Sequence, residues 1–134
     1  MEDRLRSRPE CAALFGGLDK ALSLLANTSY SYAEIPNGHA HLDNGVPVVT
    51  GAATINPTTV WINNWGPFLD QDLAVPGLAQ GVHFDFGTGL KDGDFGALIL
   101  LHELGHQAGI FGEDAQNLGE NQAHTQQVYE ACFK

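Results

Sequence analysis

The chain is poor in positive charge. Its 134 residues include six lysines and arginines against sixteen acidic residues, which gives a formal net charge of −10. No arginine follows Arg8, and the remaining cations are Lys20, Lys91 and Lys134. Nucleic acid and anionic membranes repel so acidic a surface, so we expect neither as a partner. The same surface favours cations and neutral or basic substrates.

Long apolar runs and a signal peptide are also lacking. The longest apolar run, residues 97–101, is too short to span a bilayer and suits a buried helix. The chain starts with charged residues, and we expect residues 1–8 to be a disordered leader or linker. Residues 9–134 are long enough for one domain with its own core, which we expect to be a monomer. The chain is then either a mature secreted protein or a domain of a longer one.

Cysteine is scarce, and its two copies lie near opposite ends of the chain. The spacing of Cys11 and Cys132 suits neither a CxxC redox motif nor a metal site. We predict that they form a disulfide, which implies an oxidising compartment and a secreted or periplasmic bacterial protein. The alternative is a pair of buried thiols in a cytosolic protein.

The apolar pattern predicts an α+β fold with a small, mainly antiparallel sheet. Its helices are an N-terminal helix, a buried helix in the second half of the chain and a C-terminal helix. We predict helices over residues 9–26, 95–108 and 121–132, and strands over residues 29–34, 46–50, 58–63 and 82–86. Asp92-Gly-Asp94 offers a cap for the second helix, and Gly109 a stop.

The second predicted helix carries the segment His102-Glu103-Leu-Gly-His106. Residues four apart lie one turn apart on the same face, so His102 and His106 can direct two imidazoles at one zinc ion. Glu103 is rotated by roughly 100° around the helix and is poorly placed to join that ligand set. It can instead reach a water held by the metal, which is the position of a general base in hydrolysis.

Apolar residues surround this segment on nearly every side of the helix. They are Leu98, Ile99, Leu100, Leu101 and Leu104. The helix is therefore expected to be buried, and two histidines and a glutamate on a buried helix need polar or metal partners. A pair of hydrogen-bonded core histidines is the alternative to a metal site.

A catalytic zinc ion usually takes three protein ligands and a water. Asp114 follows His106 in a turn just past the predicted helix end, and this turn can fold back over the metal. We therefore take Asp114 as the first candidate for the third ligand. The other candidates are Glu120, His124, Glu113 and Glu130.

The motif resembles that of the zincin metallopeptidases, also called HExxH peptidases. The resemblance covers about one and a half turns of helix. It implies a zincin-like fold in which His102 and His106 bind Zn²⁺ and Glu103 is the catalytic base, with a peptide or protein as substrate.

The residues after the motif narrow the resemblance. Gly109 matches the metzincin pattern HExxHxxGxxH, but Gly112 stands where its third histidine belongs, and the only methionine is the first residue. This excludes a metzincin. A gluzincin would use Glu120 or Glu130. The placement of Asp114 is similar to that of the aspartate ligand in the aspzincins, the deuterolysin-like group.

The chain also looks like small secreted bacterial domains that pair an HELGH helix with a following aspartate. Their last helix ends in a pattern similar to the one that closes this chain at Ala131-Cys132-Phe133. The function expected from the sequence is a zinc-dependent metallopeptidase that hydrolyses peptide bonds. The alternative is a catalytically inactive zinc-binding structural or interaction module, or an effector domain of a larger secreted protein.

Overall fold

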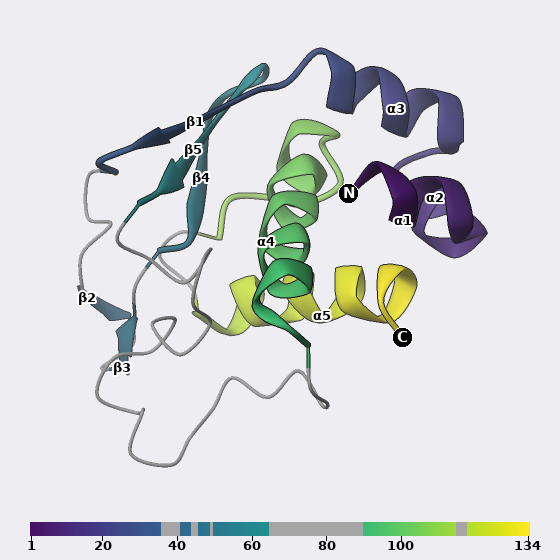
Figure 1. Cartoon of the computed structure of the whole chain (residues 1–134). Helices are drawn as coiled ribbons and strands as arrows, with labels where there is room; N and C mark the ends of the chain where they lie inside the picture. The colour runs from purple at the N-terminus through teal and green to yellow at the C-terminus, as the bar shows by residue number, and fades with distance from the viewer. Residues whose placement is uncertain (36–40, 44–45, 49, 65–89, 115–117) are drawn as a thin grey trace.

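The fold is α+β and is built around one long central helix. The computed structural model describes residues 1–35, 41–43, 46–48, 50–64, 90–114 and 118–134. The central helix, α4 (Asp92–Gln107), lies between a small sheet and the remaining helices (Figure 1). The last helix, α5 (Leu118–Cys132), crosses it. None of the helices in the described part of the chain meets the length and hydropathy of a membrane span.

Three short helices precede the sheet: α1 (Glu2–Ser7), α2 (Pro9–Leu14) and α3 (Leu18–Ala26). The chain turns between α2 and α3 because Gly16 and Gly17 adopt positive φ angles of 88° and 107°. Helical backbone requires negative φ, and glycine enters the positive region without a steric penalty. The prediction of one continuous helix in this part of the chain is therefore wrong.

The first eight residues are not a disordered leader, which corrects the prediction. The side chain of Leu5 in α1 is 1% exposed and belongs to the main core. The Arg4 guanidinium donates a hydrogen bond to Asp94 on α4 at 3.0 Å, and it lies 4.7 Å from the ring centre of Phe133. The sequence did not predict this helix, because the single buried residue Leu5 lies among charged residues and gives no periodic apolar pattern.

The main sheet has three strands in the order β1-β5-β4. β4 (Ala52–Asn56) and β5 (Thr59–Asn63) form an antiparallel hairpin, and β1 (Ser29–Ala33) pairs parallel to β5. The sheet is therefore mixed rather than mainly antiparallel. A tight turn forces the hairpin strands to be antiparallel, whereas the long connection from β1 to β4 leaves β1 free to pair in parallel.

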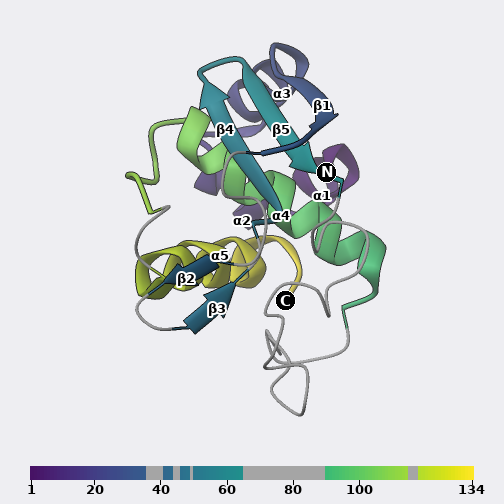
Figure 2. The ribbon, with the colours of Figure 1, turned by 90° about the vertical axis from the view of Figure 1, so that its left-hand side faces the viewer.

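A second, two-stranded antiparallel sheet joins β2 (His41–Asp43) to β3 (Val46–Val48), apart from the main sheet (Figure 2). The strand predicted over residues 46–50 is confirmed in its first three residues. β2 and β4 were not predicted. The strand predicted over residues 82–86 lies outside the described residues.

Helix α4 is buried on two sides, as its apolar flank predicts. Leu100 packs against Ala52, Val60 and Ile62 of the sheet. Residues on its other side, among them Leu98, Leu101 and Leu104, join the main core with α1, α2, α3 and α5.

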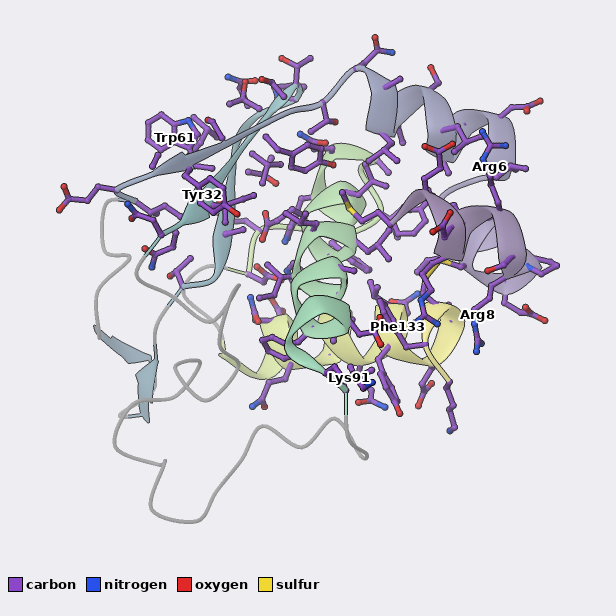
Figure 3. The ribbon with its side chains drawn as sticks, viewed as in Figure 1. Arg6, Arg8, Tyr32, Trp61, Lys91 and Phe133 are labelled. Atoms are coloured by element: carbon purple, nitrogen blue, oxygen red, sulfur yellow. A yellow bond between two sulfur atoms is a disulfide. The ribbon has the colours of Figure 1, made fainter. Side chains whose placement is uncertain are left out.

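Helix α4 starts at Asp92, and Lys91 is its N-cap. The prediction that Asp92-Gly-Asp94 caps the helix is therefore wrong. On the sheet, Trp61 lies on the face turned away from α4 (Figure 3).

The predicted disulfide is present. Cys11 of α2 and Cys132 of α5 are bonded across a sequence separation of 121 residues, and both are fully buried. The bond fixes the C-terminal end of α5 against the N-terminal helices.

Candidate metal centre

Helix α4 brings the two histidines together as their spacing predicts. The Nε2 atoms of His102 and His106 lie 3.0 Å apart. The His102 side chain is 5% exposed and the His106 side chain 15% exposed. The pair is therefore largely buried, with His106 the more exposed of the two.

The turn that ends α4 brings Asp114 back to the histidines. Helix α4 ends at Gln107 with Ala108 as its C-cap, and Gly109 follows with a φ of 72°, the left-handed conformation expected of a residue that stops a helix. The N–H groups of Ile110 and Phe111 then donate to the carbonyl of Gly105 at 3.0 and 3.3 Å, so the chain folds over the last turn of α4. Asp114 follows and is 6% exposed.

One carboxylate therefore faces two imidazoles. Asp114 Oδ2 lies 3.2 Å from Nε2 of His102, and Oδ1 lies 3.3 Å from Nε2 of His106. One ligand atom from each residue lies within 4.8 Å of the others, which is close enough for a single ion to contact all three. The buried group of His102, His106 and Asp114 can hold a metal ion.

Helix α5 supplies the next contacts. His124 Nδ1 donates to Oδ2 of Asp114 at 2.7 Å, and Asn121 Nδ2 donates to Oδ1 at 3.4 Å. Thr125 Oγ1 lies 2.9 Å from Nδ1 of His102. The ring of Phe111 stacks on that of His124 at a centroid distance of 4.4 Å and an interplanar angle of 9°.

The sequence left five candidates for the third ligand, and the structure brings two of them to the histidines. Asp114 joins the ligand group directly, and His124 contacts Asp114. The other three are exposed, and among the described residues they do not belong to the group that could hold a metal ion. These are Glu113, Glu120 and Glu130.

Glu103 faces the sheet from the same helix. Its side chain is buried, at 7% exposed, and the hydroxyl of Thr54 on β4 donates to Oε2 at 2.7 Å. Burial raises the pKa of Glu103, while His102 and the Thr54 hydrogen bond act in the opposite direction. A carboxyl with a raised pKa binds a proton more readily than an ordinary glutamate, which suits a general base.

The electrostatics of the cluster favour a cation at its centre. Burial would raise the pKa of Asp114, but the close contacts of its carboxylate with His102, His106 and His124 outweigh it and hold this pKa well below the usual range. Burial likewise opposes charge on His106, yet the hydrogen bond to Asp114 and the carboxylate of Glu103 raise its pKa. Two buried carboxylates thus draw positive charge into the site, and a metal ion can supply that charge.

The charge of Glu103 also affects the pKa of Tyr30 on β1. Burial raises its pKa to about 12, the Glu103 carboxylate adds to the shift, and the nearby Thr28 side chain partly offsets it. The folded protein holds this proton more tightly than the unfolded chain does. The stability that results is therefore present below pH 10 and is lost as the pH rises towards 12. We expect an ultraviolet titration of the folded protein to show a tyrosine ionisation near pH 12 that Tyr30→Phe lacks. An unchanged titration in the variant would contradict this assignment.

Position 105 requires glycine because the ring of Phe111 packs closely against it. A Cβ atom on Gly105 would overlap the ring of Phe111. We expect Gly105→Ala to lower the free energy of unfolding by about 1–3 kcal/mol, although alanine favours helix, because a packed core resists added volume. Gly93→Ala is the matched control on α4, because its Cβ would meet open space. Denaturant unfolding of both variants tests this, and equal stabilities would contradict it.

Three polar partners in the site escaped the sequence analysis: Thr54, Asn121 and Thr125. Thr54 reaches Glu103 from a strand that was not itself predicted, and no local pattern marks such a contact. Asn121 and Thr125 are four residues apart on a helix and share a face, which is a usable signal. It identifies the face but not what the face contacts.

Comparisons with known proteins found no relative of this chain. No protein-family model matches the chain, and neither a curated protein nor a solved structure matches it. The functional argument therefore depends on the geometry of the site alone.

Proposed function

We propose that the protein is a zinc-dependent metallopeptidase of the zincin type. The observation that carries this proposal is the triangle of ligand atoms from His102, His106 and Asp114. Bonds of about 2.0–2.1 Å from a tetrahedral zinc ion place its ligand atoms about 3.3–3.4 Å apart. The closest approaches here are 3.0 Å between the two Nε2 atoms, 3.2 Å from Asp114 Oδ2 to His102 Nε2 and 3.3 Å from Asp114 Oδ1 to His106 Nε2, and one ligand atom from each residue lies within 4.8 Å of the others. Two imidazoles and one carboxylate also match the chemistry that zinc prefers at catalytic sites.

Glu103 supports hydrolysis in particular, because a purely structural ion needs no buried carboxylate beside its ligands. A zinc ion held by the three ligands supplies a Lewis acid that lowers the pKa of water and polarises a carbonyl. Glu103 accepts a proton from the attacking water, and it can return that proton to the leaving amine nitrogen. Thr54 holds one carboxylate oxygen during these transfers.

The acidic surface favours neutral or basic peptides as substrates. The disulfide supports a secreted or periplasmic location, because such bonds persist in oxidising compartments. We expect the domain to act as a monomer on a peptide or protein.

The test is to purify the wild type and His106→Ala, measure bound metal by elemental analysis, and assay both on an unstructured casein-like substrate. We expect about one zinc ion per chain in the wild type, with cleavage that a chelator abolishes and added zinc restores. His106→Ala should lose both metal and activity. A wild type that takes up no metal under any reconstitution condition would refute the proposal.

A zinc-binding module without turnover is the second candidate, and the position of His124 favours it. Its Nδ1 lies 2.7 Å from Asp114 Oδ2, so a small shift would make His124 a fourth ligand and close the site. Cobalt substitution separates the two candidates. An open peptidase site should change its visible absorption when acetohydroxamate is added, because a free coordination position accepts the anion. A closed four-ligand site should not respond.

A further inference from the structure

One turn of α5 aims three polar side chains at the ligand cluster. Asn121, His124 and Thr125 are spaced three and four residues apart and therefore share one face of the helix. The first two contact Asp114, and the third contacts His102. The far end of the same helix is fixed by buried Val128 and by the disulfide at Cys132. These contacts hold the turn in place.

The Thr125 hydroxyl has one proton and makes two contacts. Oγ1 lies 2.9 Å from the carbonyl oxygen of Asn121 and 2.9 Å from Nδ1 of His102. A carbonyl oxygen can only accept, so the hydroxyl must donate its proton to Asn121. Both contacts are hydrogen bonds only if Oγ1 accepts from a proton on Nδ1 of His102. No other placement of these two protons makes both contacts of the Thr125 hydroxyl hydrogen bonds.

A proton on Nδ1 of His102 leaves the lone pair of a neutral imidazole on Nε2. Nε2 is the atom that faces His106 and Asp114. We infer that Thr125 is a positioning residue that holds His102 in the tautomer that binds a metal through Nε2. This inference rests on the proposed metal site.

The contact between Thr125 and His102 is important because both residues are buried. His102 is 4% exposed and Thr125 is 9% exposed, so water is a poor substitute for the hydroxyl. Without Oγ1, a proton on Nδ1 loses its acceptor, and the Nε2–H tautomer, which cannot bind the metal there, becomes competitive. Partners of this kind behind a metal-binding histidine typically change metal affinity by about 10- to 100-fold.

The experiment compares zinc affinity, measured by competition with a chromogenic chelator, in the wild type, Thr125→Val and Thr125→Ser. Valine keeps the shape and removes the hydroxyl, whereas serine keeps the hydroxyl and removes the methyl group. We expect Thr125→Val to bind zinc about 10- to 100-fold more weakly and Thr125→Ser to stay close to the wild type. Circular dichroism shows whether each variant is folded.

A second readout needs no variant. In the zinc-loaded wild type, a ¹H–¹⁵N spectrum of the histidine rings should show a His102 Nδ1 proton that exchanges slowly with solvent. A His102 that binds zinc through Nδ1, or that carries its proton on Nε2, would overturn the inference, as would equal zinc affinity in Thr125→Val and the wild type. A wild type that binds no zinc would instead overturn the proposed function, and this inference with it.

Discussion

Glu103→Gln is expected to reduce peptide hydrolysis by about 10²- to 10⁴-fold, the usual contribution of a general base. Glutamine matches glutamate in shape, and its amide oxygen can still accept from the Thr54 hydroxyl. It cannot accept a proton from water at neutral pH. Zinc content should not fall, because Glu103 is not among the three grouped ligands. The measurement is kcat/KM on one peptide, with bound zinc determined on the same samples.

The matched control for this change is Glu113→Gln, which makes the same substitution at an exposed position beside Asp114. It should leave both rate and zinc content near those of the wild type. If Glu103→Gln keeps the wild-type rate, Glu103 is not the base. If Glu103→Gln loses zinc as well as activity, the carboxylate contributes to the metal site instead.

Removal of the disulfide should have the largest effect on stability. In the chain-entropy description, a crosslink that closes a loop of 121 residues stabilises the fold by about 4–5 kcal/mol. Domains of this size are stable by about 5–15 kcal/mol in total. We therefore expect the double variant Cys11→Ala/Cys132→Ala to lose a large share of its free energy of unfolding. Urea unfolding monitored by circular dichroism measures the difference.

A reducing agent provides the control for this prediction. It should destabilise the wild type to a similar extent and leave the double variant unchanged, because that variant has no cysteine left. A loss below about 1 kcal/mol would contradict the prediction and would indicate an unfolded chain that is already compact around these two positions.

The local part of the site was predictable from the sequence, and the tertiary part was not. His102 and His106 follow from helix periodicity alone, and Gly109 from the need for a positive φ after the helix. Asp114 was reachable because the turn that positions it directly follows the motif. The roles of Thr54 and Thr125 could not be predicted, because their contacts with α4 depend on how a strand and another helix pack against it.

The same division holds for the fold. The strongly patterned segments, α4, α5 and β5, were predicted, whereas α1 was missed because one buried leucine in a charged segment gives no periodic signal. The helix predicted over residues 9–26 runs through the pair Gly16-Gly17, although two positive φ angles at this pair end one helix before the next one starts. The parallel pairing of β1 depends on a long connection, and sequence patterns carry no information on that choice.

The bond between Cys11 and Cys132 also affects how damage to this protein can be seen. Any single backbone cut between these residues leaves two pieces that are still covalently joined. Such a nicked molecule migrates with intact protein under non-reducing denaturing conditions and separates into fragments only after reduction. Self-digestion by a peptidase with this layout would therefore pass unnoticed in an unreduced gel, and a preparation would look homogeneous while part of it was cleaved.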